Sequence, residues 1–190
     1  MSKLKSLIFI SSILFIFGCV EKNGLNPIAP LASDFIIGRD YKNFTSKMEN
    51  SDTLKLTVNL SMCGWMEFDE IVITKNESQI YIQVKEKRIY NDTTIFFPKV
   101  PYELKNDTLD LEKMINEFDA NYIKTTSSPF FIITHPKQKD TIVLRTTGLF
   151  NRGFNIQRYN RIMFELYPKE MDEYYLDFFG QTYNEYNRGI

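Results

Sequence analysis

Cys63 and His135 are the two residues of this chain whose types could act together as a nucleophile and a base. A cysteine nucleophile needs a base to generate its thiolate and a third group to orient the imidazole. Cys63 follows a segment with strand character, and His135 ends another such segment before Pro136. Two strand ends can converge at one edge of a sheet, so the pair is a candidate hydrolase dyad. The alternative is a buried thiol and a solvated histidine in a turn.

Other common kinds of active site are disfavoured by the residues present. The chain has one histidine and two cysteines, too few for the usual zinc sites. Phosphate-binding glycine loops, the dinucleotide fingerprint and the Gly-x-Ser-x-Gly elbow are absent. The acidic stretch at residues 106–112 lacks the central glycine and the spacing of a calcium-binding loop. We therefore expect no metal site and no cofactor.

Trp65 is the single tryptophan, and it follows a glycine just beyond a predicted strand. A large aromatic side chain in that position can anchor a binding patch. It can equally plug the open end of the sheet, where burial stabilises it. Trp65 is therefore a candidate binding residue with a structural alternative.

Cys19 is the residue of the N-terminal segment that can carry a modification. Lys3 and Lys5 give the chain a positive start, and residues 7–17 are apolar apart from two serines. Such a segment is typical of a secretory signal, and the apolar run is shorter than the ~20 residues that a spanning helix needs. Its last four residues, Ile16-Phe17-Gly18-Cys19, resemble the lipobox of bacterial lipoproteins.

The resemblance to bacterial lipoproteins implies cleavage before Cys19 and acylation of this cysteine. Several acyl chains on one residue give stable membrane attachment without a transmembrane helix. Val20 follows the cysteine, in place of the aspartate that resembles an inner-membrane retention signal, so we expect the outer membrane. The predicted organisation is a signal peptide (1–18), a lipid-anchored flexible stalk (19–34), one domain (35–182) and a frayed tail (183–190).

Charge and size narrow the class of protein further. The formal net charge of the chain is −1, and removal of the signal peptide would take away two lysines and no acid. A mildly acidic domain with interspersed signs lacks the basic patch expected for nucleic-acid binding. A chain of this length can bury enough surface to fold without disulfides. Cys63 would have no intramolecular partner once Cys19 is acylated, which favours a buried, inert thiol.

Alternation with a period of two predicts an antiparallel sheet. The clearest strand alternates Leu54, Leu56, Val58, Leu60 and Met62 with polar residues. Further strands are predicted over residues 68–74, 79–85, 93–97, 130–134 and 141–146. Asn91-Asp92 favours a tight hairpin turn. Pro98 and Pro101 exclude a central position for the strand at 93–97, so we place it at an edge.

Periodicity of three to four residues predicts the helices. Residues 109–119 form one, with Asp107 or Thr108 as its cap, and Asp40 caps a short helix near the start of the domain. Residues 156–167 fit a helix, although part of this range also reads as a strand. Pro168 suits the first turn of a last helix that Gly180 would end. The fold class is therefore α+β: an antiparallel sheet of about five to six strands with helices packed on one face, mostly C-terminal.

Three functions remain open from the sequence. The first is a non-catalytic envelope module that binds or assists an envelope or secreted protein, with edge strands and the tail tyrosines Tyr183 and Tyr186 as contact surface. The second is a cysteine-dependent hydrolase using Cys63 and His135. The third is a passive structural component of the envelope.

Overall fold

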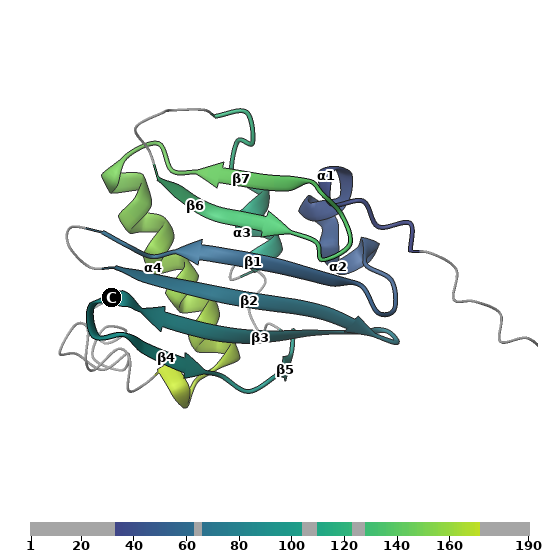
Figure 1. The fold of residues 1–190 in the computed structure, drawn as a ribbon, viewed down its shortest axis with the longest axis horizontal. Helices are drawn as coiled ribbons and strands as arrows, with labels where there is room; N and C mark the ends of the chain where they lie inside the picture. Colours follow the sequence, from purple (N-terminus) through teal and green to yellow (C-terminus); the bar gives the residue numbers. More distant parts are fainter. Residues whose placement is uncertain (1–32, 63–65, 104–109, 123–127, 172–190) are drawn as a thin grey trace, which may run out of the picture. The chain divides into compact units, whose positions relative to one another are not determined.

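Seven antiparallel strands form one sheet in the order β4-β3-β2-β1-β6-β7, with the short β5 also paired to β3 (Figure 1). The structure is a computed structural model that describes residues 33–62, 66–103, 110–122 and 128–171. The strands are β1 (Thr53–Asn59), β2 (Glu67–Asn76), β3 (Gln79–Arg88), β4 (Thr93–Phe96), β5 (Val100–Pro101), β6 (Pro129–Thr134) and β7 (Thr141–Arg145). The α+β class is confirmed, with β5 as the strand that the sequence did not predict.

The two longer helices, α3 (Leu111–Asn116) and α4 (Leu149–Leu166), lie on one face of this sheet, as expected (Figure 1). The shorter helical segments are α1 (Ile37–Asp40), η1 (Tyr41–Asn43), α2 (Phe44–Lys47) and η2 (Ile89–Asn91), the last in the connection between β3 and β4. Figure 1 shows α3 and α4 behind the strands, with α1 and α2 at the end where β1 begins. The range 156–167, open between helix and strand, belongs to α4 except for its last residue. Its buried side chains Tyr159, Ile162, Met163 and Leu166 recur every three to four residues.

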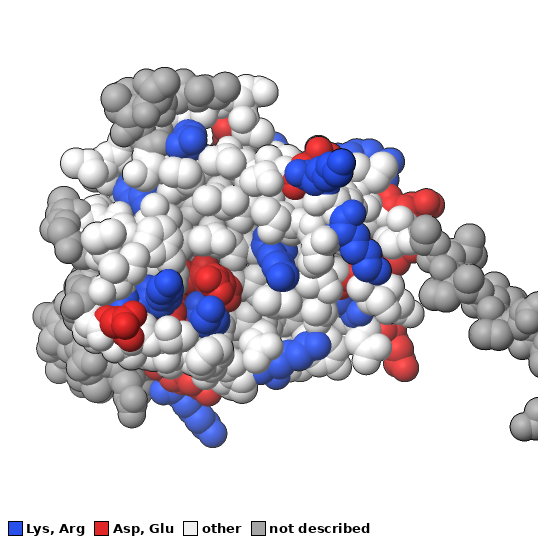
Figure 2. Space-filling model, viewed as in Figure 1, with Lys and Arg blue, Asp and Glu red and all other residues white. Residues whose placement is uncertain are grey.

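The two faces of the sheet differ because side chains alternate along each strand. Leu54, Leu56 and Val58 of β1 are buried under the helices. The opposite face is open, and Figure 2 shows lysines and arginines interspersed there with acidic residues. One ion pair on it joins Lys85 to Glu70 at 2.8 Å.

The hairpin and edge predictions are confirmed, whereas both helix caps are corrected. Asp40 is the last residue of α1 and makes no side-chain cap hydrogen bond to the segment that follows. Asp92 adopts φ 50° in the turn before β4, and β4 lies at the edge of the sheet. The cap of α3 is Asp110, whose side chain accepts hydrogen bonds from the N–H groups of Glu112 and Lys113. Asp107 and Thr108, which the sequence suggested, lie outside the described residues. Asp110 is the N-cap because it directly precedes the first helical turn, where its side chain can reach the free N–H groups.

The described part of the chain begins at the end of the sheet where β1 also begins. Ser33 Oγ donates a hydrogen bond to Asp52 Oδ2 at 2.6 Å, so Ser33, assigned to the stalk, already contacts the domain. The signal peptide, nearly all of the stalk and the frayed tail lie outside the described residues. Among the residues described, no helix combines the length and apolar composition needed to cross a membrane.

Candidate functional site

The residues singled out in the sequence fall into two groups. Cys19, Cys63 and Trp65 lie outside the described residues. His135 is described, and it is buried rather than solvated. Its ring packs on Phe35 at a centroid distance of 6.0 Å, and its Nδ1 accepts the N–H of Lys137 at 3.2 Å. Nε2 lies 4.0 Å from Asp52 Oδ1. These contacts give His135 a structural role in closing this end of the core.

The register of the sheet places His135 and Met62 at opposite ends of β1. His135 follows Thr134, which pairs with Lys55 near the start of β1. Seven residues of extended chain, from Lys55 to Met62, span roughly 20 Å. Cys63, the other member of the predicted dyad, lies outside the described residues, so the dyad stays a prediction from the sequence.

Three carboxylates meet between the sheet and α4, at the end where β2 begins and β3 ends. Glu67, Asp69 and Glu86 are buried, with exposed fractions of 1%, 5% and 3%, and one oxygen of each lies within 4.8 Å of the others. Tyr159 of α4 donates to Asp69 Oδ2 at 2.5 Å, and Arg88 pairs with Glu86. We call these three residues the carboxylate cluster. It is the one group of potential metal ligands in the part of the chain that the structure describes.

The electrostatics of the carboxylate cluster are dominated by burial. Burial raises the pKa of Asp69 well above its usual range, with Tyr159 opposing and the two glutamates adding to the rise. The pKa of Glu86 is raised by burial as well, against the lowering effect of Arg88. Tyr159 has a pKa raised by burial and by the adjacent Asp69, so its phenol stays protonated and donates. A buried group of this composition attracts a positive charge.

Sequence reasoning missed the carboxylate cluster, although the alternation contained its signal. Glu67 and Asp69 continue the inward series of Ile71 and Ile73 in β2, and Glu86 continues that of β3. The predicted strands began at residue 68 and ended at residue 85, which left out Glu67 and Glu86. Asp69 lay within the first of these strands but was not assigned to a face of the sheet. Acids at inward positions of a strand would have marked the site, because unpaired charges are costly there.

A second candidate site is an exposed apolar surface at the same end of the sheet. Eight large hydrophobic side chains of the described residues are exposed, and six of them lie at this end. We call these six the distal apolar surface: Met62, Met66, Ile89, Leu149, Phe150 and Phe154. Met66 O accepts the N–H of Ile89, and the side chain of Met62 lies against Gly153 of α4. These contacts join the strand ends to the first turns of the helix.

Arg152 fixes the start of α4 against the strands. Its guanidinium donates to the carbonyls of Asn59 at 2.6 Å and Ser61 at 2.7 Å, and it stacks over the ring of Phe130 at 5.7 Å. The next positions outward on this part of the helix are Phe150 and Phe154, which therefore project away from the core. The exposure of these two rings follows from how the buried arginine orients the helix.

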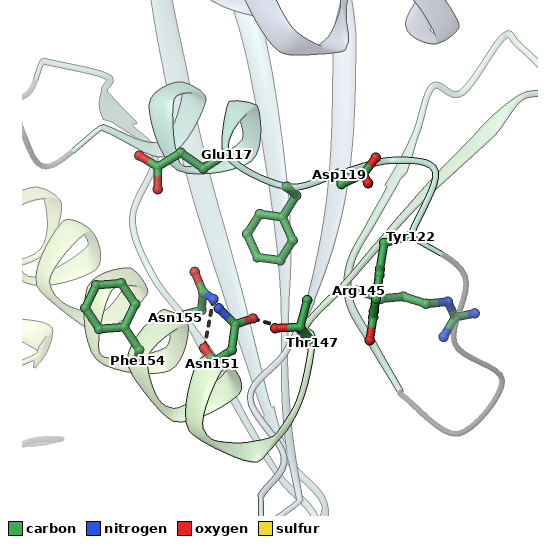
Figure 3. A pocket seen from close by; sticks show the side chains of 9 residues that line it. Glu117, Asp119, Tyr122, Arg145, Thr147, Asn151, Phe154 and Asn155 are labelled. Atoms are coloured by element: carbon green, nitrogen blue, oxygen red, sulfur yellow. Dashed lines mark hydrogen bonds between the residues drawn. The ribbon is translucent and has the colours of Figure 1, made fainter.

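A polar hollow of about 240 Å³ adjoins the distal apolar surface (Figure 3). Asn151 Oδ1 accepts the N–H of Thr147, and Asn155 donates to the carbonyl of Asn151, so the amides are held in place. The lining residues are Glu117, Phe118, Asp119, Tyr122, Arg145, Thr147, Asn151, Phe154 and Asn155. The volume is below the 300–1,000 Å³ typical of small-molecule sites.

Comparison with family models, with curated proteins and with solved structures finds no match to this chain.

Proposed function

We propose that this chain is a lipid-anchored protein of the bacterial envelope whose domain binds another protein through the distal apolar surface. The observation that carries the binding role is the exposure of the first turns of α4. Phe150 is 93% exposed, Leu149 69% and Phe154 58%. An exposed apolar cluster on a folded domain is typical of an interaction site, because water contact with these rings is unfavourable.

The surroundings of Phe154 fit the anatomy of a protein interface. Phe154 lines the polar hollow, and it also lines a second hollow of about 210 Å³ together with Gln157, Arg158 and Arg161. Interfaces combine an apolar, aromatic centre with a polar rim that supplies hydrogen bonds and registers the partner. Phe150 and Phe154 would be the anchors of this interface.

The position of the distal apolar surface agrees with an N-terminal anchor. The described chain begins at Ser33, beside Asp52, whereas Met62 lies ten residues further along an extended strand. Ten extended residues span roughly 30 Å. A chain anchored at Cys19 would enter the domain at Ser33, which contacts Asp52 at the opposite end of β1 from Met62. We place this anchor in the outer membrane.

The binding role is tested by capturing proteins from envelope and secreted extracts on the purified domain, in parallel with Phe150→Ser/Phe154→Ser. We expect one partner in near-equal amount on the unaltered domain and at least a tenfold weaker dissociation constant for the double variant, since central aromatic anchors contribute about 2 kcal/mol or more each. The measurement is a titration with the recovered partner.

Phe96→Ser is the matched control for these variants. Phe96 is 71% exposed but lies on β4, away from the distal apolar surface, so its replacement should leave the affinity unchanged. Equal affinities of the domain and the double variant for the same partner would contradict the proposal. So would an equal loss in Phe96→Ser, because the effect would then report general surface hydrophobicity.

The anchor is tested separately by labelling cells with a radioactive fatty acid. Label should enter the unaltered chain and Cys63→Ser, and it should be absent from Cys19→Ser, which retains Cys63. Fractionation of the two membranes should place the labelled protein with outer-membrane markers. Label in Cys19→Ser, or an unlabelled parent chain, would contradict lipidation at this residue.

A further inference from the structure

We propose that Glu67, Asp69 and Glu86 bind one divalent cation of the oxygen-preferring kind, Ca²⁺ or Mn²⁺, which ties β2 and β3 to α4. The proposal is independent of the binding role proposed above. It starts from the spacing of the ligands. Three oxygens within 4.8 Å of one another can surround an ion at a distance of about 2.8 Å or less. Small side-chain shifts bring this distance to the 2.3–2.6 Å that calcium–oxygen bonds require.

An orphaned oxygen points to a ligand at the carboxylate cluster. Asp69 Oδ1 is buried and finds no hydrogen-bond partner, a condition it shares with one other side-chain atom among the described residues, Thr74 Oγ1. A buried carboxylate oxygen without a partner is costly, and native proteins rarely leave one unexplained. Asp69 Oδ2 is already engaged by Tyr159. A cation at the cluster would satisfy the remaining oxygen.

A divalent cation of the oxygen-preferring kind suits the ligands of the carboxylate cluster. The three carboxylates can supply oxygens to one ion, and Arg88 pairs with Glu86 behind it. Carboxylate oxygens favour calcium, manganese and magnesium over softer metals. Calcium accepts irregular sets of oxygen ligands, whereas magnesium demands near-ideal octahedral geometry.

The groups behind the ligands match the outer shell of a metal site. Ligating carboxylates are usually held by further hydrogen bonds that orient them toward the ion. Tyr159 holds Asp69 from α4, and Arg88 holds Glu86 from within β3. Tyr159 itself is completely buried, so its orientation is fixed by packing. Three inward strand positions, where isoleucine or valine would be usual, thus carry acids whose carboxylates are held by neighbouring side chains.

The test is calorimetry on the full chain in detergent, after chelator treatment and dialysis, with CaCl₂ and MnCl₂ as titrants. We expect one equivalent to bind, and the thermal midpoint to rise by several degrees and return on adding chelator. Glu67→Gln and Glu86→Gln should weaken binding at least tenfold. Glu70→Gln, which changes an acid of the same strand on the open face, should bind as the parent chain does.

Terbium luminescence locates the ion even if the glutamine variants do not fold. Tb³⁺ replaces Ca²⁺ at oxygen sites, and its emission is excited through a nearby tyrosine. Tyr159 contacts Asp69 directly, so Tyr159→Phe should bind one Tb³⁺ with several-fold lower emission. The proposal is overturned if the parent chain binds neither ion below 1 mM. It is also overturned if the variants bind like the parent, or if Tyr159→Phe keeps full emission.

Discussion

Individual side chains in this domain act mainly by satisfying buried backbone and carboxylate groups. Arg152, Asp110 and Asp40 each bind two or more partners that would otherwise lose hydrogen bonds on burial. The contribution of such a residue to the free energy of unfolding depends on which buried groups lose their partner when it is replaced. An unpaired buried polar group destabilises the fold by more than one hydrogen bond stabilises it. Two predictions at the residue scale follow from this asymmetry.

Arg152→Met should lower the free energy of unfolding by about 2–4 kcal/mol, because the carbonyls of Asn59 and Ser61 lose a charged donor. Urea unfolding measures this change. Arg158→Met is the control on the same helix: its partner Glu117 is 62% exposed, so we expect a loss below about 1 kcal/mol. Equal losses in the two variants would contradict the role assigned to Arg152.

Asp40 should make stability depend on pH in the acid range. Hydrogen bonds from Arg39, together with the N–H of Ile36, lower the pKa of Asp40 to about 2. A carboxyl with a pKa lower in the folded than in the unfolded state stabilises the fold above about pH 4, and this contribution is lost as the pH falls toward 2. The urea midpoint of Asp40→Asn should therefore fall less between pH 4 and 2 than that of the parent chain.

Asp92→Asn is the comparison for the acid-range experiment. Asp92 is exposed in the turn before β4, and asparagine tolerates the left-handed conformation found there. Its urea midpoint should follow that of the parent chain across the same pH range. A parent-like acid profile in Asp40→Asn would show that other carboxylates cause the loss.

At the scale of elements, α4 carries both candidate sites. Its inward face supplies Tyr159 to the carboxylate cluster, and its first turns expose Phe150 and Phe154. The helix starts at Gly148, where φ is 158° with an extended ψ. This region of backbone conformation is open to glycine and strained for other residues. The residue at which the helix starts therefore depends on this glycine. The positions of the exposed Phe150 and Phe154 rings depend on it in turn.

Two glycine-to-alanine variants of α4 should have opposite effects. Gly153 lies within the helix, and a Cβ there would meet Met62 Sδ at 3.8 Å, an ordinary contact. Gly153→Ala should therefore stabilise by about 0.5–1 kcal/mol. Gly148→Ala should destabilise by about 1–3 kcal/mol because of its backbone conformation. Thermal unfolding compares them, and a shift of the same sign in both would contradict this account.

At the scale of the whole molecule, the sheet is most strongly held at its centre. β1 lies between β2 and β6 and is covered by the helices, whereas β4 has four residues and pairs with β3 alone among the described strands. We expect amide hydrogens of β1 to exchange only through global unfolding, and those of β4 to exchange by local opening. Hydrogen exchange with mass spectrometry measures this order, and comparable protection of the two strands would contradict it.

The sequence by itself determined the α+β class, the principal strands and the edge position of β4, because alternation, prolines and turn residues act within a few neighbouring positions. The lipidation of Cys19 remains a prediction from the N-terminal motif. The tertiary structure decided which segments meet. Glu67 and Glu86 lie far apart along the chain but become neighbours through the register of β2 and β3, and Tyr159 joins them from α4.

Strand pairing also places His135 at the start of β1, away from its last residue Asn59, and the packing of α4 on the sheet brings Met62 to Gly153. Strand order and register are long-range properties, set by how all buried faces pack together. Both sites proposed for this domain depend on that packing. The alternation of β2 and β3 marks the three acids as inward-facing, but it does not specify that α4 covers them.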